Sequence, residues 1–298
     1  MPHEVSVVVP HYGDPAPTRA LLDALLAQGG PDDVQLIVAD DASEPPFPEV
    51  DGVEVVRRTS NGGFGSAVNT GAAAARHPLL LVLNSDLEVG PTFLTDLLAA
   101  AAPWLPAVVS PRVVDRAGRP AWTGRHFPTT RHQTVEWLTP LARLRDRPRL
   151  HEAVGHDTEA ANATTVVDWV IGAALLLPTA DFRAVGGFDE QFFMNAEEVD
   201  LQRRLLQRGL RAVALDAPVV VHEGGGSSDP ERRRRWLVTS RLQYAEKWGG
   251  RRRLQAALTG ATAVNLAWNT GRRLAGRPVQ PIRTARHELD LIFDRLGV

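Results

Sequence analysis

The segment LLLVLNSDLEVGPTFL, residues 79–94, decides the fold class of this chain. Its five leading apolar residues, 79–83, predict a strand inside a sheet, because a half-exposed strand would alternate apolar and polar side chains. The Asn-Ser-Asp triplet at 84–86 ends the strand with residues that favour turns. A helix is predicted over 94–102. The segment is therefore typical of a strand–turn–helix unit of an α/β protein.

Similar units lie on both sides of this segment. Apolar, β-branched runs predict strands, and apolar residues at helical spacing predict helices between them. We expect strands over residues 4–9, 34–39, 53–56, 166–177 and 218–221, and helices over residues 18–28, 64–76 and 231–248. This alternation predicts a mainly parallel, mixed sheet flanked by helices, whose ligands bind beyond the carboxyl ends of the strands.

The composition is that of an ordinary globular protein, with 44% of the 298 residues apolar and 23% charged. The chain contains no cysteine, which excludes disulfides and thiolate chemistry. No apolar run approaches the roughly 20 residues that span a bilayer, and the first residues lack the features of a signal peptide. These features predict a cytoplasmic protein.

The charge is unevenly distributed along the chain. Residues 231–298 hold 15 basic and 5 acidic residues, a net of +10, so the other 230 residues carry a net of −12. A basic tail indicates an anionic partner, such as a membrane surface, a phosphate-bearing substrate or nucleic acid, or else a solvated surface without a partner. If residues 232–235 and 251–253 bind an anionic membrane, that binding should weaken as salt rises.

The regular pattern dissolves between residues 118 and 165, which are rich in Arg, Pro, His and Thr. We interpret 118–165 as an insertion that either selects a substrate or is a surface excursion. The predicted organisation is a catalytic domain over 1–228, with a nucleotide-binding half to about residue 115 and an acceptor half from about residue 116. A basic helical extension over 229–298 is expected to pack on this domain.

Three polar motifs lie where strands end or helices begin. Asp86 follows a buried strand, where a carboxylate can hold Mg²⁺ or Mn²⁺ with phosphate oxygens, and the alternative is a simple strand-end turn. His222 also ends a strand and is either a metal ligand or a cap of the following loop. The glycines after Asn61 either let backbone N–H groups approach an anion or form a tight turn.

The stretch NAEEVDLQRRLLQRG, residues 195–209, opens a predicted helix with a cluster of acids. Asn195 and Glu198 have the spacing of a capping box, and acids in the first turn suit the helix dipole. Capping does not account for Asp200. The alternative is catalysis, since a carboxylate within hydrogen-bond reach can deprotonate an acceptor hydroxyl.

Seven segments carry a resemblance: VSVVVPHYGD, LIVADDAS, NGGFGSAVNTGAAAA, LLLVLNSDLEVGPTFL, DWVIGAALLLPTADFRAVGGFDEQFFMNAEEVDLQRRL, VVVHEGGGSS and SRLQYAEKWG. Together they resemble the family 2 glycosyltransferases, which have the GT-A fold, and among these the bacterial rhamnosyltransferase-like members. The resemblance covers about residues 5–112 and 166–248. It implies a GT-A catalytic domain with a C-terminal helical extension.

The resemblance implies an inverting, metal-assisted single displacement. A sugar would pass from a nucleoside diphosphate donor, such as dTDP-rhamnose, to a hydroxyl of a glycan, lipid-linked or small-molecule acceptor. The implied donor contacts are Pro10, Tyr12, Asp40, Asp41, Asn61, Gly62, Gly63, Asn69, Asn84 and Arg241. The implied acceptor contacts are Trp169, Gly172, Gly187, Phe188 and Asp189. Mg²⁺ or Mn²⁺ would lie on Asp86 and His222, and the base would be Glu197 or Glu198.

Two positions depart from the family pattern. Asn84 replaces the first acid of the DXD metal motif, and Glu198 stands where the family usually has Asp, so the base stays open between Glu197 and Glu198. Two other functions are considered: a catalytically degenerate nucleotide-sugar-binding module, and a sugar nucleotidyltransferase, whose triphosphate loop is missing from PHYGDPAP. The expected partners are the two substrates and an anionic membrane contacted by the basic tail, and not nucleic acid.

Overall fold

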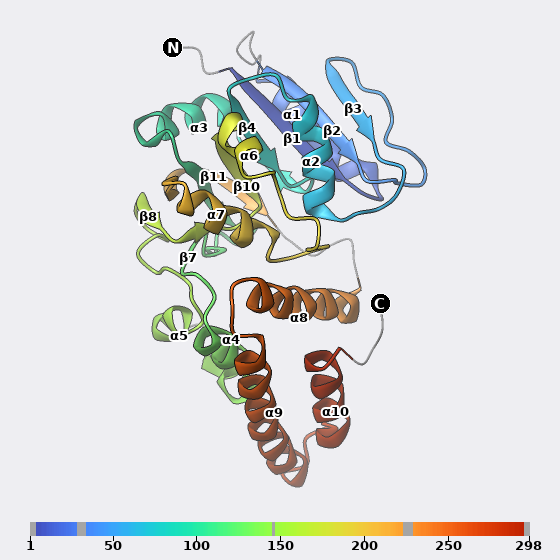
Figure 1. Ribbon diagram of the computed structural model, residues 1–298, viewed down its shortest axis with the longest axis vertical. Helices are drawn as coiled ribbons and strands as arrows, with labels where there is room; N and C mark the ends of the chain where they lie inside the picture. The colour runs from blue at the N-terminus through green and yellow to red at the C-terminus, as the bar shows by residue number, and fades with distance from the viewer. Residues whose placement is uncertain (1–3, 29–33, 145–146, 223–228, 295–298) are drawn as a thin grey trace. The chain divides into compact units, whose positions relative to one another are not determined.

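The computed structural model describes residues 4–28, 34–144, 147–222 and 229–294 (Figure 1). Its contacts divide the chain into two compact units, one of Met1–His126 with Asp157–Ser228 and one of Phe127–His156 with Asp229–Val298. The sequence places residues 127–156 in the acceptor half, whereas the structure groups them with the C-terminal helices. The reason is that α4 (Thr130–Trp137) packs on α9 (Arg251–Leu274).

The first unit is built on a mixed sheet with the strand order β3-β2-β1-β4-β10-β6-β11-β5, and β8 also pairs with β11. The neighbours β3, β2, β1 and β4 are parallel, as are β6 and β11, and β10 runs antiparallel between β4 and β6. A separate two-stranded sheet joins β7 and β9. The bounds are β1 (Val5–His11), β2 (Val34–Asp40), β3 (Val53–Arg57), β4 (Leu79–Leu83), β5 (Leu87–Glu88), β6 (Val108–Val114), β7 (Gly124–Arg125), β8 (Thr165–Val167), β9 (Trp169–Val170), β10 (Ala174–Pro178) and β11 (Ala212–His222).

Helices cover both faces of the large sheet, which fits the unbroken apolar strands (Figure 1). Neighbouring residues of β1 point to opposite faces: Val7 packs in a core with α1 and α3, and Val8 packs in a core with α2, α6 and α7. The bounds are α1 (Pro15–Leu26), α2 (Phe64–Ala74), α3 (Phe93–Ala101), the 3₁₀ turn η1 (Ala102–Trp104), α6 (Thr179–Ala184) and α7 (Glu197–Gln207).

The second unit is helical and has its own core. The remaining elements are η2 (Thr139–Leu144), α5 (Pro148–Ala153), α8 (Pro230–Lys247) and α10 (Pro281–Ile292). Trp137 packs against apolar residues of α8, α9 and α10, and its Nε1 donates to Thr262 Oγ1 at 2.9 Å. Glu288 is buried beside Asn265 and Arg234. No helix in the described part of the chain is both long and apolar enough to cross a membrane.

Two sequence-based expectations about strands are wrong. The continuous strand expected over 166–177 is three short strands with different partners: β8 pairs with β11, β9 with β7, and β10 with β4 and β6. Within β9, the Val170 N–H donates to Gln202 Oε1 of α7 at 2.8 Å, and Gln202 Nε2 donates to the Val170 carbonyl at 2.7 Å. The region 118–165, expected to be irregular, contains β7, α4, η2 and α5. The glycine-rich stretch after His222, at 223–228, lies outside the described residues.

Candidate active site

The two aspartates at the end of β2 have buried carboxylates that are fully engaged within the protein. Asp40 accepts from the Ser43 N–H at 2.9 Å and the Phe47 N–H at 3.1 Å, and it pairs with Arg57 at 2.5 Å. Burial alone would raise the pKa of Asp40, but the hydrogen bonds from Ser43 and Phe47 and the charge of Arg57 hold it below its ordinary value. Asp40 is therefore placed to order its own loop, since each of its two oxygens accepts a hydrogen bond within the protein.

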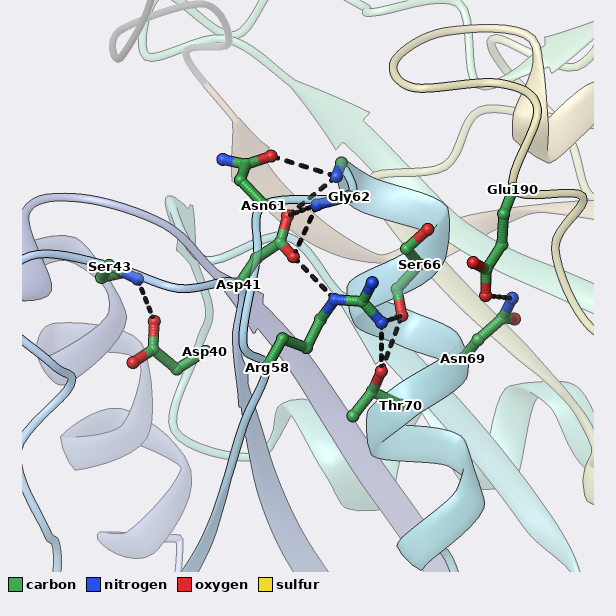
Figure 2. Close-up of polar contacts among 11 residues, drawn as sticks. Asp40, Asp41, Ser43, Arg58, Asn61, Gly62, Ser66, Asn69, Thr70 and Glu190 are labelled. Carbon is green, nitrogen blue, oxygen red and sulfur yellow. Dashed lines mark hydrogen bonds and ion pairs between the residues drawn. The ribbon is translucent and has the colours of Figure 1, made fainter.

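Asp41 fixes the glycine-rich turn. Its carboxylate accepts from the Gly62 N–H at 3.0 Å and the Gly63 N–H at 2.8 Å, and Arg58 Nε lies 2.8 Å from Oδ1 (Figure 2). Arg58 in turn donates to Thr70 Oγ1 at 2.6 Å, which ties the turn to α2. Asp41 thus holds the glycine-rich turn in place, and sequence reasoning missed Arg58 as its partner.

The turn itself leaves no room for a side chain at Gly63. This residue has φ +84°, and a Cβ there would lie 1.9 Å from the Phe193 carbonyl oxygen. The exposed Asn61 orders the turn through its Oδ1, which accepts from the Gly63 N–H at 3.2 Å. The turn leads directly into α2, whose N-cap residue is Gly63 itself.

Asn69 of α2 clamps the predicted acceptor turn. Its Oδ1 accepts from the Phe188 N–H at 2.8 Å, and its Nδ2 donates to the Phe188 carbonyl at 2.9 Å and to Glu190 Oε1 at 3.1 Å. The Asn69–Glu190 contact is visible in Figure 2. Gly187, at φ +69°, admits this contact, because a Cβ there would lie 2.4 Å from Asn69 Oδ1. Asn69 therefore positions the turn that the sequence assigned to the acceptor, with Asp189 bonded to Gln191 within it.

Asn84, Asp86 and His222 converge at the ends of β4 and β11. His222 Nε2 lies 3.1 Å from Asp86 Oδ1 and 3.3 Å from Asn84 Nδ2. Burial would raise the pKa of Asp86, but the hydrogen bond and charge of His222 hold it below its ordinary value. Asn84 Oδ1 is buried, and no hydrogen-bond partner for it lies among the residues that the structure describes. The structure thus brings together the residues that the sequence singled out for a metal.

The acid-rich helix α7 begins without the capping box expected from the sequence. Asn195 and Ala196 both have left-handed backbone conformations, with φ of 69° and 68°, and no side chain caps the helix. The box would need an extended cap residue whose side chain faces the N-terminal N–H groups. Non-glycine residues at positive φ carry strain that proteins retain where function requires it. This start directs Glu197 and Glu198 inward rather than back along the helix end.

Glu197 and Glu198 each have one buried carboxylate oxygen that accepts no hydrogen bond from the described part of the chain. Glu197 is only 4% exposed, whereas Glu198 is half-buried. Burial raises the pKa of Glu197 well above its ordinary value, and the charge of Glu198 raises it further. Burial also raises the pKa of Glu198, against backbone hydrogen bonds and the charge of Arg125. Gly172 leaves space for Glu198, since a Cβ there would lie 3.3 Å from the Glu198 Cβ.

Arg125 is a residue of this site that the sequence did not reveal. It lies on β7, and its guanidinium stands 5.7 Å from the ring centre of Trp169 on the paired strand β9. Trp169 is buried and donates from Nε1 to the His126 carbonyl at 2.9 Å. Arg125 thereby places a positive charge near Glu198. It was missed because it falls in a stretch without a recognisable pattern.

The other expected site residues are exposed to solvent, buried in a strand, or paired with a charged side chain of the protein. Tyr12 is 59% exposed at the end of β1, while Pro10 is buried in the strand. Asp200 is fully buried and pairs with Arg204 at 2.8 Å, which gives it a structural role in α7. Arg241 belongs to the second unit, where it lies 2.5 Å from Glu136. Its guanidinium is therefore already engaged by a carboxylate.

Comparison with known proteins agrees with this geometry. The sequence pattern described as Glycosyl transferase family 2 matches residues 6–162, more than half of the chain. The chain belongs to glycosyl transferase family 2. This family 2 glycosyltransferase is 29% identical over 241 residues to the N-acetylglucosaminyl-diphospho-decaprenol L-rhamnosyltransferase of Mycobacterium tuberculosis, a match covering 74% of this chain and 76% of the relative.

Two further comparisons bear on the enzyme class and the fold. The glycosyltransferase is 31% identical over 226 residues to the validoxylamine A glucosyltransferase of Streptomyces hygroscopicus subsp. limoneus, a match covering 69% of this chain and 48% of the relative. The solved mannosyltransferase PcManGT of Pyrobaculum calidifontis, in complex with GDP-Man and Mn²⁺, superposes with a TM-score of 0.56 at 18% identity, covering 98% of this chain and 87% of that one. The fold of the glycosyltransferase is the GT-A fold, as expected.

The side chains near Asp86 in this glycosyltransferase are of the kinds that ligate a divalent metal. Within the described residues no group of three His, Cys, Asp or Glu side chains could hold a metal ion. Asp86 and His222 do lie next to each other, and the buried Asn84 Oδ1 lies beside them without a partner among those residues. A carboxylate, an imidazole and an amide oxygen suit Mn²⁺ or Mg²⁺ when substrate phosphates supply further oxygens. These residues would hold such an ion.

Glu197→Gln should stabilise the glycosyltransferase at neutral pH. The folded-state pKa of Glu197 is raised above 4.5, so the stability of the wild type is full below that value and falls as pH rises toward the folded-state pKa. Glutamine stays neutral and avoids this loss. We expect a higher Tm than wild type at about pH 7.5 and little difference at about pH 4. The same Tm change at both pH values would contradict this, and exposed Glu49→Gln is the control.

Proposed function

We propose that this glycosyltransferase moves a sugar, with inversion, from a nucleoside diphosphate donor to an acceptor hydroxyl in a single displacement. The observation that supports this best is the inward-facing, half-buried carboxylate of Glu198 at the start of α7. Glu198 is more accessible than Glu197, so we assign it as the base. Glu197, which is more deeply buried, would then lie beside this base without taking the proton.

In the proposed reaction the Glu198 carboxylate accepts the proton of the acceptor hydroxyl. The hydroxyl oxygen forms a bond to the anomeric carbon while the bond from that carbon to the diphosphate oxygen breaks. The electron pair of the broken bond leaves with the nucleoside diphosphate. Attack from the face opposite the leaving group inverts the anomeric configuration. Asn69 would keep the turn at Phe188 in register with the donor side of the site.

Asp86, His222 and Asn84 would hold the divalent metal of this reaction. A bound Mn²⁺ or Mg²⁺ would offset the negative charge that develops on the diphosphate leaving group. The N–H groups at the start of α2 and the turn held by Asp41 would face the same diphosphate. The family pattern supports this division of roles.

The names of two relatives support a narrower substrate proposal. One is the mycobacterial L-rhamnosyltransferase described above, and another is the rhamnosyltransferase WbbL of Escherichia coli, 34% identical over 88 residues. We propose a dTDP-rhamnose donor and an acceptor linked to a lipid through a diphosphate. We also propose that the enzyme works in the cytoplasm and meets an anionic membrane through its basic tail.

The proposal is tested by calorimetry and turnover. Nucleoside diphosphates should bind in the presence of Mn²⁺ and bind more weakly without it, and one sugar nucleotide of a panel should be turned over faster than the others. A folded protein that binds no nucleotide in either condition would refute the transferase assignment. Binding without turnover of any donor on any acceptor offered would favour a degenerate binding module instead.

Asp86→Asn should weaken Mn²⁺-dependent nucleotide binding by at least about tenfold, because it removes the carboxylate of the metal group. Asn84→Asp should strengthen Mn²⁺-dependent nucleotide binding, since it adds a carboxylate beside the same ion. Calorimetric titration of a nucleoside diphosphate at fixed Mn²⁺ measures both, with the exposed Asp51→Asn as the matched control. Equal affinities for wild type and Asp86→Asn would remove Asp86 from the metal site.

A further inference from the structure

The hairpin of α9 and α10 has its tip at residues 270–287 (Figure 1). The exposed side chains of this tip are both aliphatic and basic. Leu274, the last residue of α9, is 86% exposed, and Ile282 at the start of α10 is 65% exposed. Side chains of this kind are normally buried or scattered singly. Here both lie at the same turn of one helical hairpin, whose two helices pack on each other.

Three arginines of the hairpin tip line one groove between the two helices. Arg273 comes from α9, and Arg283 and Arg286 come from α10, with Ile282 between them in the groove wall. The groove encloses about 880 Å³, and of its lining residues Asp290 alone is acidic. The tip therefore presents a concave, basic surface with an aliphatic side chain inside it.

The charge of the tip is not neutralised within the protein. Elsewhere in the second unit Arg234 pairs with Glu288, Arg241 with Glu136 and Arg251 with Glu246. In the described part of the chain, by contrast, Arg273, Arg283 and Arg286 have no ion-pair partner. Residues 270–287 carry five arginines and no acidic residue, a net of +5, in the same tip that exposes the two aliphatic side chains.

We propose that the hairpin tip binds the surface of an anionic phospholipid bilayer. Guanidinium groups donate in a fixed fork that matches phosphate oxygens, so Arg273, Arg283 and Arg286 would engage lipid headgroups. Leu274 and Ile282 would enter the boundary between headgroups and acyl chains, where aliphatic side chains lose contact with water. Arginines beside anionic lipids and a few inserted aliphatic residues are the two contributions that give reversible peripheral binding.

Other partners fit this surface less well. Binding to single-stranded nucleic acid uses aromatic side chains on which bases stack, and the groove is lined by no Phe, Tyr or Trp. Pairing of two copies through the same tip would bring arginines against arginines, which like-charge repulsion opposes. A lipid surface satisfies both the positive charge and the exposed aliphatic residues, so the chemistry favours it.

The inference rests on the proposed function in one respect: membrane docking would bring the enzyme to a lipid-linked acceptor. The experiment is cosedimentation of the full chain with vesicles of phosphatidylglycerol and phosphatidylcholine, compared with phosphatidylcholine alone. The wild type should bind the anionic vesicles and lose binding as salt rises. Removing the three groove charges, by Arg273→Gln, Arg283→Gln and Arg286→Gln together, should weaken binding about a hundredfold.

Two further variants make the result specific to the tip. Leu274→Ser with Ile282→Ser keeps every charge and should weaken binding about tenfold or more. The control removes three exposed charges of the same unit that lie outside the basic tail, by Arg131→Gln, Arg147→Gln and Arg149→Gln, and should keep most of the binding. Circular dichroism verifies that each variant is folded.

The inference is overturned if the wild type does not bind anionic vesicles, if it binds neutral vesicles equally well, or if the control variant loses as much binding as the groove variant. Binding to an oligonucleotide that is stronger than to anionic vesicles would also overturn it. Nucleotide calorimetry separates this question from the proposed function, since vesicle binding without nucleotide binding would reject the transferase mechanism and leave the docking surface standing.

Discussion

Glu198→Gln should lower kcat for sugar transfer by about 10²–10⁴-fold, the range that a positioned general base supplies. The amide keeps the size of the side chain but cannot take the proton of the acceptor hydroxyl. Nucleotide affinity should change little, because the loss falls on the chemical step. Steady-state kinetics with the preferred donor, together with calorimetry of the nucleoside diphosphate, measures the two effects separately.

The pH profile of the wild type gives a second readout of the same assignment. Burial raises the pKa of Glu198, and a base is active only when it is ionised, so activity should fall on the acid side at a higher pH than for an ordinary glutamate. Exposed Glu49→Gln is the matched control and should keep wild-type kcat. A large loss in Glu197→Gln with near-wild-type Glu198→Gln would transfer the role to Glu197.

Gly63→Ala should destabilise the protein by about 3 kcal/mol or more, because two costs coincide. The backbone has φ +84° and ψ 179°, a region used almost only by glycine. The new methyl group would also overlap the Phe193 carbonyl oxygen, which a Cβ approaches to 1.9 Å. Any relaxation must move the turn held by Asp41, so nucleotide affinity should fall as well. Urea unfolding and calorimetry measure these two losses.

Gly118→Ala separates the two costs. Gly118 also has positive φ, +75°, but a Cβ there would meet nothing within 4 Å. The Gly118→Ala variant should be destabilised only by the backbone strain, about 1 kcal/mol, and should keep its nucleotide affinity. Equal destabilisation by the two substitutions would show that the contact with Phe193 is not important at Gly63.

The sheet of the first unit was predictable because buried strands leave long apolar runs. The strand at 79–83 is observed as predicted, and the alternating units around it give the predicted GT-A fold. The expected strand at 166–177 is interrupted because its three parts pair with different strands, and the Gln202 side chain, distant in sequence, binds the backbone of Val170. Periodicity reports burial along one segment, and it contains no information about a side chain that arrives from another element.

The candidate site was predictable where polar residues follow a strand and less so elsewhere. Asn84, Asp86 and His222 meet because strand ends share one region of the sheet. Arg125 comes from a segment without periodicity, and only the tertiary structure brings its charge near Glu198. The prediction of a capping box was wrong for a related reason. The backbone before α7 has positive φ angles at Asn195 and Ala196, and the sequence does not indicate them.

The pairing of Asp41 with Arg58 limits how this protein can be re-engineered. The carboxylate comes from the loop after β2, the guanidinium from the residue after β3, and the turn they hold opens α2. In a chimaera that takes only the glycine-rich turn from a relative, Asp41 and Arg58 would face a turn with a different backbone conformation. Exchange of donor preference between relatives should therefore succeed when the whole block from Asp41 to Thr70 is transplanted, and fail when the turn moves alone.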